Sequence, residues 1–170
     1  MDPKVYETVE EMLRQRGYSE ITTEGEITYG DRKICVFYNT SQKFGVDRVE
    51  EYVKIMNDIK IKNGIVVYKE NVTPVARRVI DELPDFTIEL FNENEMRYNI
   101  TKHRLVPNHE KLSKTDTIAF KKQFGVRIPA ILKTDPVARF YSFQRGDVIK
   151  ITRRDGTISY RLVKIGRAHV

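Results

Sequence analysis

The chain contains two apolar runs, Lys33-Ile34-Cys35-Val36-Phe37-Tyr38 and Gly64-Ile65-Val66-Val67-Tyr68. Both runs are short and rich in β-branched or aromatic residues, so each predicts a strand that is buried on both faces. Between them, residues 46–59 carry apolar side chains at helical spacing, which predicts an amphipathic helix. A strand, a helix and a strand in that order are typical of an α/β layer structure.

The flanking segments extend this alternation in both directions. A helix is expected over residues 6–16, and another begins at Thr73-Pro74, where Thr can cap and Pro fits the first turn. Residues 86–91 alternate apolar and polar side chains, which predicts a half-buried strand. Residues 92–98 are polar and predict a hinge. The first half is therefore expected to be an α/β domain over residues 1–97.

The second half has a different pattern, with four segments typical of regular elements. These are helices over residues 113–125 and 135–141 and strands over residues 147–153 and 158–163. Phe120 and Phe124 are expected to face inward from the first of these helices. Asp155-Gly156 favours a hairpin between the two strands. We therefore predict a small α+β domain with an antiparallel hairpin and sheet over residues 98–165.

Charge is divided unevenly between the two halves. Residues 1–97 hold 14 Lys+Arg and 19 Asp+Glu, a net charge of −5, whereas residues 98–170 hold 16 and 5, a net charge of +11. Such asymmetry indicates two units with different partners. The basic half is expected to face nucleic acid or an acidic protein surface, and a solvated basic face without a dedicated partner is the alternative.

Membrane and secretory patterns are missing from the sequence. No apolar run approaches the ~20 residues that a membrane span requires, and Met1-Asp2-Pro3-Lys4 lacks the pattern of a secretory signal. The only cysteine, Cys35, cannot form an internal disulfide, which favours a reducing compartment. We therefore expect no membrane partner.

Catalytic and metal-binding patterns are missing as well. His103 and His109 are the nearest pair of possible metal ligands, and Cys35 lies far from both in sequence, so a zinc site is not expected. No nucleophile elbow or Gly-rich phosphate loop is present. A nuclease would need clustered acids, and the nearest candidates, Asp31 and Asp58, match no known spacing. We predict no catalytic residue, no metal and no cofactor.

Two basic segments are candidates for binding. Arg77 and Arg78 follow Thr73-Pro74 within the first two turns of a predicted helix, where exposed N–H groups and the macrodipole attract anions. A contact to the DNA backbone and plain capping with two solvated arginines are both open interpretations. Residues 150–164 form a basic hairpin with Tyr160 as its only aromatic residue, which favours protein docking over recognition of bases.

Longer motifs resemble a known family. In the second half they are Asn99-Ile100-Thr101-Lys102-His103-Arg104-Leu105-Val106-Pro107-Asn108-His109, Asp135-Pro136-Val137-Ala138-Arg139-Phe140-Tyr141, Arg145-Gly146-Asp147-Val148-Ile149-Lys150-Ile151 with Arg153-Arg154, and Tyr160-Arg161-Leu162-Val163. They resemble the assembly domain of the fifth, shared subunit of eukaryotic-type DNA-directed RNA polymerases. The corresponding small subunit of archaeal RNA polymerase is similar to this half alone. In the first half, Arg16-Gly17-Tyr18, Gly64–Tyr68 and Thr73–Ala76 resemble the jaw domain of the eukaryotic subunit.

The resemblance implies a non-catalytic polymerase subunit that docks on the largest subunit and lines the downstream DNA path during transcription, while catalysis belongs to other subunits. It implies weak contacts with downstream duplex DNA at five jaw residues. They are Thr73, Pro74, Ala76, Arg77 and Arg78. It also implies an interface with the largest subunit in the second half. The residues implied there are His103, Pro107, His109, Asp135, Pro136, Arg139, Tyr141, Arg145, Gly146, Arg153 and Tyr160.

Two departures from the family pattern limit what the resemblance implies. The segment between Tyr18 and Ile34 is shorter than in a eukaryotic jaw, which indicates a reduced or viral version, and Val75 stands where the family has a small polar residue. The expected location is the nucleus for a cellular protein, or a viral factory or virion for a virus-encoded one. Residues 166–170 are interpreted as a non-native tail. A stand-alone DNA-binding adaptor and a degenerate nuclease-like domain are the alternative functions.

Overall fold

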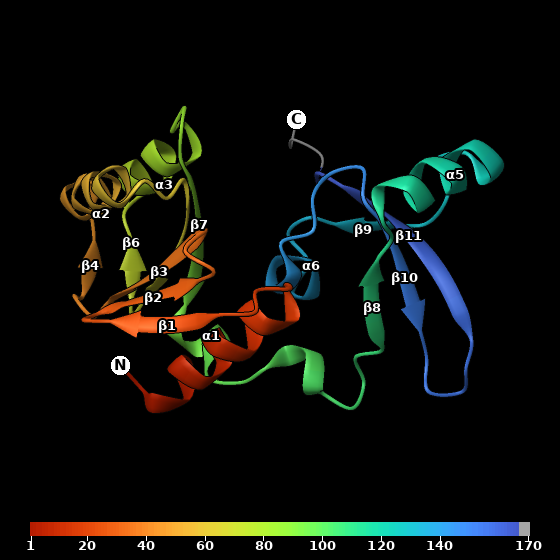
Figure 1. Ribbon diagram of the computed structural model, residues 1–170, viewed down its shortest axis with the longest axis horizontal. Coiled ribbons are helices and arrows are strands. Elements are labelled where there is room, and N and C mark those ends of the chain that lie inside the picture. Colours follow the sequence, from red (N-terminus) through yellow and green to blue (C-terminus); the bar gives the residue numbers. More distant parts are fainter. Residues whose placement is uncertain (167–170) are drawn as a thin grey trace. The chain divides into compact units, whose positions relative to one another are not determined.

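The computed structural model describes residues 1–166, and residues 167–170 of the expected tail lie outside that range. The chain divides into two compact units, Met1–Tyr98 and the residues from Asn99 onward (Figure 1). Both units mix helices with strands, in agreement with the predicted α/β class. Among the described residues, no helix is long and apolar enough to cross a membrane.

The first unit alternates strands and helices along the chain. Its elements are α1 (Pro3–Gln15), β1 (Ile21–Glu24), β2 (Ile27–Gly30), β3 (Ile34–Asn39), β4 (Lys43–Phe44), α2 (Val46–Ile59), β5 (Asn63–Tyr68), β6 (Asn71–Val72), α3 (Pro74–Asp81), β7 (Thr87–Asn92) and α4 (Glu93–Met96). Five strands form one sheet in the order β1-β2-β3-β5-β7. Within it, β3, β5 and β7 are parallel, whereas β1, β2 and β3 pair antiparallel.

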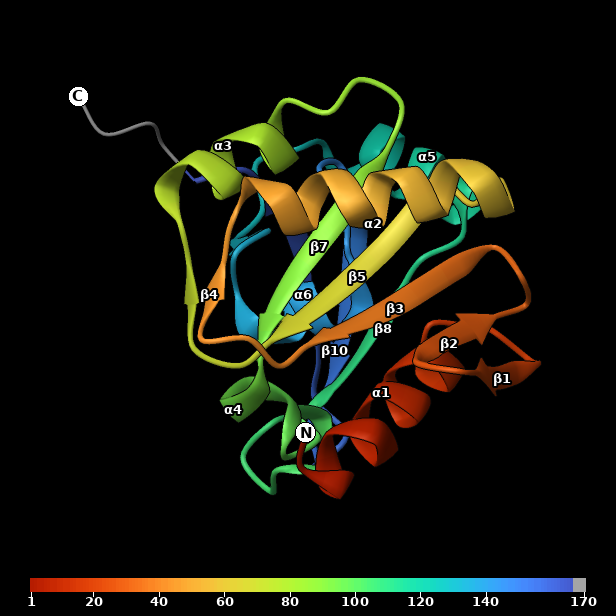
Figure 2. The same cartoon turned by 90° about the vertical axis from the view of Figure 1, so that its left-hand side faces the viewer.

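Helices cover the central strands of this sheet, which explains the two apolar runs. Figure 2 shows α2 and α3 on one side of the sheet and α1 on the other. On the α2 side, Cys35 and Phe37 pack into one cluster with Met56, Ala76 and other apolar side chains. Strands that are covered on both faces need apolar residues at every position, and the sequence supplies them.

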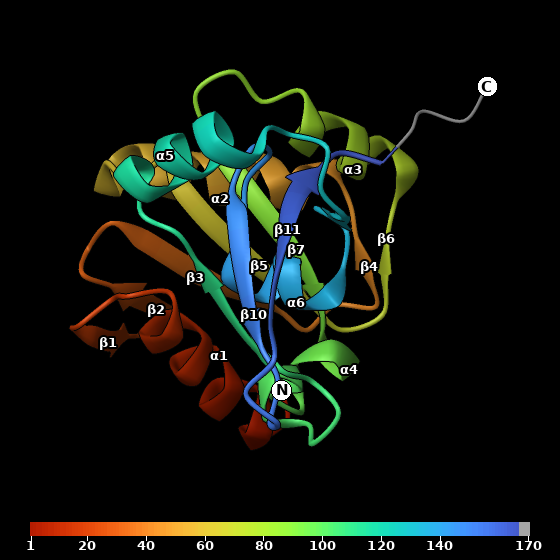
Figure 3. The ribbon, with the colours of Figure 1, turned by 90° about the vertical axis from the view of Figure 1, so that its right-hand side faces the viewer.

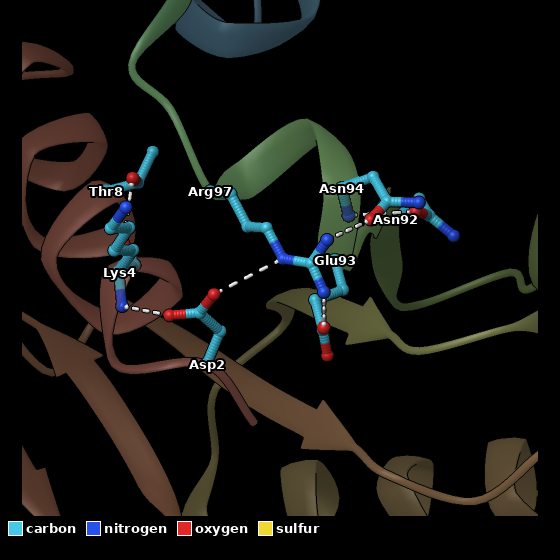
Figure 4. Close-up of polar contacts among 7 residues, drawn as sticks. All are labelled: Asp2, Lys4, Thr8, Asn92, Glu93, Asn94 and Arg97. Atoms are coloured by element: carbon cyan, nitrogen blue, oxygen red, sulfur yellow. Dashed lines mark hydrogen bonds and ion pairs between the residues drawn. The ribbon is translucent and has the colours of Figure 1, made fainter.

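The polar segment at residues 92–98, predicted as a hinge, instead begins with the short helix α4. Asn92 caps this helix, and the Glu93 side chain is only 4% exposed. Arg97 binds Glu93 at 2.5 Å and Asp2 at 3.3 Å, and Asp2 in turn caps α1 by accepting from the backbone N–H of Lys4 (Figure 4). Polar contacts thus tie the end of the first unit to its start, and polarity alone does not distinguish such a segment from a linker.

The second unit is built on a four-stranded sheet. Its elements are a 3₁₀ helix η1 (Ile100–Lys102), β8 (Asn108–Lys111), α5 (Lys114–Phe124), β9 (Ala130–Leu132), α6 (Pro136–Tyr141), β10 (Val148–Thr152) and β11 (Ile158–Lys164). The strand order is β8-β10-β11-β9, and β10 pairs antiparallel with both β8 and β11. The expectation of a wholly antiparallel sheet is wrong for β9, which lies parallel to β11. Parallel strands need a long crossover connection, and here α6 and β10 lie between the two strands in the chain.

The two faces of this second sheet differ in how well they are buried. Ile149 and Ile151 pack with Ala138 of α6 in the core cluster, and Figure 3 shows α6 behind β10 and β11 with α5 near their upper end. Helix α5 has no buried residue. Phe120 packs on the Tyr160 ring at 4.8 Å, but Phe124 is 59% exposed, so the expectation that it faces inward is wrong.

Candidate functional site

A recess of about 420 Å³ lies on the α6 side of the second sheet. Its position follows from the strand register, in which His109 of β8 lies directly opposite Ile151 of β10. Directly paired residues point to the same face of a sheet, so the two side chains share one wall. Ile131 and Leu132 of β9 supply an apolar wall on the other side of the recess.

The recess brings together four residues that the sequence placed at a subunit interface: Pro107, His109, Asp135 and Arg153. These residues are spread over nearly fifty positions of the chain. Arg161 also lines the recess and was missed, although it belongs to the basic hairpin. The alternation of side chains along β11 could have indicated which face of the sheet Arg161 occupies. The register of β11 with β10 and β9, which brings that face to the recess, is known only from the folded sheet.

The recess is basic and suited to binding an anion. Arg153 forms no ion pair with any described residue, and Arg161 donates a hydrogen bond only to the Ala130 carbonyl, at 3.3 Å. Asp135 is the one carboxylate in the lining, and it already accepts from the Val137 N–H as the cap of α6. The His109 ring bonds to the Pro107 carbonyl at 2.8 Å, which orients the ring within the wall.

The other predicted interface residues lie elsewhere in the second unit. Arg145 and Gly146 line a separate recess beside Lys121. Tyr160 lies on the α5 side of the sheet, against Phe120. Tyr141 stacks on Phe143 at the edge of the core.

Three predicted interface residues have local structural positions. Pro136 occupies the first turn of α6, and Arg139 lies half-buried on the same helix. The His103 ring accepts a hydrogen bond from the Leu105 N–H. The predicted residues are thus divided among several places in the second unit: four line the basic recess, and Arg145 and Gly146 line another.

The five predicted DNA-proximal residues surround the start of α3. The Thr73 hydroxyl accepts from the Ala76 N–H at 3.1 Å, and Pro74 occupies the first turn. Ala76 is fully buried, whereas Arg77 and Arg78 are exposed. Capping therefore accounts for Thr73, Pro74 and Ala76, and the two arginines are the side chains that can reach a ligand.

The acidic residues considered for a nuclease do not form a metal site. The Asp31 carboxylate accepts hydrogen bonds from the backbone N–H groups of Glu20 and Ser19, which lower the pKa of that carboxyl. Among the described residues, no three His, Cys, Asp or Glu side chains are grouped to hold a metal ion. Burial raises the pKa of the Cys35 thiol to about 12, so little reactive thiolate forms near neutral pH.

Comparisons with known proteins match both units. The family model for the C-terminal domain of RNA polymerase Rpb5 matches residues 98–163. The rpabc1 subunit of DNA-directed RNA polymerases I, II and III of Dictyostelium discoideum is 38% identical over 139 residues, covering 76% of this chain and 71% of that relative. The DNA-directed RNA polymerase subunit 5-like protein 1 of Arabidopsis thaliana is 35% identical over 190 residues, covering 91% of this chain and 89% of that relative.

A third relative, the RPABC1 subunit of RNA polymerases I, II and III of Caenorhabditis elegans, is 29% identical over 198 residues and covers 94% of both chains. These proteins are accessory polymerase subunits, which agrees with the missing metal and nucleophile patterns in the sequence. The resemblance noted in the sequence motifs is thereby confirmed. The chain belongs to the family of subunit five of the eukaryotic DNA-directed RNA polymerases and is a non-catalytic subunit of such an enzyme.

Proposed function

We propose that the second unit docks on the largest subunit of an RNA polymerase through the basic recess around Arg153 and Arg161. The observation that carries the proposal is the convergence of these two arginines with apolar side chains of β9 and β10. Arginine beside an apolar wall is typical of the residues that dominate protein interfaces. The partner surface is expected to be an acidic segment, because a single carboxylate, Asp135, lines the recess.

Charge reversal within the hairpin tests this docking site. Arg153→Glu is compared with Arg154→Glu, a neighbouring exposed arginine that does not line the recess. Co-expression with the largest subunit should give at least ~10-fold less co-purified complex for Arg153→Glu, because a desolvated like-charge contact costs more than about 1.4 kcal/mol. Arg154→Glu should behave as wild type, and both should melt normally. Equal retention of both variants would mean that the docking face lies elsewhere.

Arg145 needs a separate measurement, because it lines a different recess beside Lys121. The sequence motifs predict Arg145 and Arg153 near one contact, and in the fold they line different recesses. Arg145→Glu alone should weaken co-purification if the docking surface extends to that recess. Wild-type retention of Arg145→Glu, together with loss of Arg153→Glu, would restrict the interface to the recess around Arg153.

We further propose that the start of α3 lies beside downstream duplex DNA in the assembled polymerase. Arg77 and Arg78 are exposed next to a capped helix start, where phosphates are favoured. The remainder of the first unit is acidic, so DNA binding by the isolated chain should be weak and salt-sensitive, with a slope of about one in log K per phosphate contact.

The double variant Arg77→Glu with Arg78→Glu should co-purify with the polymerase as wild type does, and the assembled polymerase should bind downstream DNA more weakly. Tight, sequence-specific binding by the isolated chain would favour a DNA-binding adaptor instead.

The cellular location follows from membership of a polymerase. We infer that the chain acts in the nucleus together with other polymerase subunits, because the relatives serve RNA polymerases I, II and III of eukaryotes. For a virus-encoded copy, the corresponding location is a viral factory or a virion. Immunofluorescence of the tagged chain with and without its largest subunit distinguishes these locations.

A further inference from the structure

A second recess of the second unit, of about 400 Å³, lies at the end of β11, where α5 is close to that strand (Figure 3). Two backbone hydrogen bonds hold its wall: the Gly146 N–H donates to the Val163 carbonyl at 3.0 Å, and the Val163 N–H donates to the Asp147 carbonyl at 2.9 Å. Gly146 has a φ of 90°, a conformation that glycine adopts without strain. The turn that carries Arg145 is therefore fixed against β11, and Lys121 of α5 also lines the recess.

The Lys121 ammonium lies over the backbone of this turn. Its Nζ is 3.5 Å from the position that a Cβ on Gly146 would occupy, so the glycine leaves room for the ammonium. The Lys121 side chain is half-buried and forms no hydrogen bond or ion pair with any described residue. Arg145 and Lys164, the other cations of the lining, are exposed, and no carboxylate is among the described residues that line the recess. Because the three cations repel one another, an entering anion is attracted.

Aliphatic side chains complete the lining. They are Leu162 and Val163 of β11 and Ile165 just beyond it, and Ile165 is 60% exposed. An aliphatic side chain that entered the recess would be removed from water against these residues. None of the described residues that line the recess is aromatic, whereas single-stranded nucleic acid is usually bound by stacking of its bases on aromatic rings. The lining therefore suits an acidic polypeptide with an aliphatic residue better than it suits nucleic acid.

We propose that this recess binds an acidic segment of a partner polypeptide. Carboxylates of that segment pair with Lys121 and Arg145, and an aliphatic side chain between them packs on Leu162 and Ile165. The size of the recess suits a few side chains rather than a folded surface. It shares no lining residue with the recess around Arg153, so binding here does not rest on the docking proposed there.

The test uses the full chain, labelled with ¹⁵N, and three acetylated and amidated tripeptides: Glu-Leu-Glu, Gln-Leu-Gln and Glu-Ala-Glu. The second peptide keeps the shape of the first without its charge, and the third keeps the charge without the large aliphatic side chain. Glu-Leu-Glu should shift the Gly146 and Ile165 amide resonances in a saturable manner, with a Kd at least ~3-fold lower than that of either other peptide. A thymidine trinucleotide, which carries the same charge as Glu-Leu-Glu, should bind more weakly at these resonances. A lower Kd for the trinucleotide would favour nucleic acid and overturn the proposal.

Lys121→Gln should raise the Kd of Glu-Leu-Glu at least ~3-fold, because it removes a positive charge from the lining. The matched control is Lys122→Gln, which removes the same charge from a neighbouring exposed residue of α5 outside the lining. Unchanged binding by Lys122→Gln and by Arg153→Gln supports the proposal, and the ¹⁵N spectrum of each variant verifies its fold.

Equal weakening by Lys121→Gln and Lys122→Gln would reveal general charge attraction and overturn the proposal. Equal Kd values for Glu-Leu-Glu and Gln-Leu-Gln, or no shift at Gly146, would also overturn it. Weakening by Arg153→Gln alone would place the peptide in the other recess, which likewise contradicts binding beside Lys121. The docking proposal is tested by co-purification of Arg153→Glu, so the two proposals can fail separately.

Discussion

Arg16 shows how a residue of a recognised motif can have a structural role. Its two terminal nitrogens donate to the two carboxylate oxygens of Glu89 at 2.8 and 3.0 Å, and its side chain is only 5% exposed. Glu89 belongs to β7, so the pair fixes the end of α1 against the sheet. A guanidinium of this burial needs a charged acceptor, because its own desolvation is costly.

Replacing Glu89 by Gln should therefore destabilise the first unit. We expect the free energy of unfolding to fall by about 2–3 kcal/mol, since the buried guanidinium keeps its charge and loses the Glu89 carboxylate. The control is Glu10→Gln, because Glu10 and Arg14 form an exposed pair worth at most about 1 kcal/mol. Urea denaturation measures both variants. Similar losses of unfolding free energy in the two variants would show that the burial of Arg16 adds little to the strength of its ion pair.

Asp31 gives a prediction about pH. Backbone hydrogen bonds from Glu20 and Ser19 hold its pKa below the ordinary value of 3.8. A carboxyl whose pKa is lower in the folded state than in the unfolded state stabilises the folded state at pH values above its unfolded-state pKa. This contribution is lost as the pH falls through the folded-state pKa. Asp31→Asn should therefore lower the Tm at about pH 6, with a difference that shrinks as the pH falls below the ordinary value of 3.8. Asn tolerates the φ of 51° at this position, so a difference that is constant with pH would exclude the charge as its cause.

Three helix starts were predicted well, whereas α1 begins at Pro3 with Asp2 as its cap and not at residue 6 as expected. Thr73, Ser113 and Asp135 each cap a helix through a side-chain hydrogen bond, and two of these caps are followed by Pro. Capping depends on neighbours within three residues, so a local pattern is sufficient to predict it. The pairing of β9 with β11 depends instead on residues far apart in the chain, and no local pattern distinguishes parallel from antiparallel there.

The cap of α3 can be tested directly. Thr73→Ala removes the acceptor for the Ala76 N–H and should lower the free energy of unfolding by about 1 kcal/mol. Thr73→Ser keeps a hydroxyl at the same position and should recover most of that loss. Thermal melts of both variants give the comparison. Equal stability of the Ala and Ser variants would show that this hydrogen bond contributes little to the free energy of unfolding. An effect of Thr73→Ala on DNA binding could then not be attributed to the loss of the cap.

Over the whole molecule, the charge division was evident from composition, but the candidate site was not. His109, Asp135 and Arg153 meet only because β8 pairs with β10 and α6 covers one face of their sheet. The motifs predicted these residues one by one. The strand register adds Arg161 to the same face of the sheet and places Tyr160 on the opposite face. Residue identity predicts the chemistry of a surface, and strand pairing decides which residues share it.

The second unit has the features of an independently folding domain. Its sheet is complete within the unit, and its core of Ile131, Ala138, Phe143, Ile149, Ile151 and Val163 comes from that unit alone. The core is small, and residues 98–170 carry a net charge of +11. Stability is therefore expected to be modest, with self-repulsion opposing the compact state.

A chain of residues 98–165 should consequently fold on its own and melt cooperatively, with a Tm that rises as salt screens the repulsion among its basic side chains. At ionic strengths near 1 M the Debye length falls to about 3 Å, so most of that repulsion should be removed. The first unit, with its smaller net charge, should show a weaker dependence on salt. Circular dichroism melts of both fragments at low and high salt make the comparison. If residues 98–165 are unfolded at every salt concentration while the full chain is folded, the second core depends on the first unit and the proposed boundary is wrong.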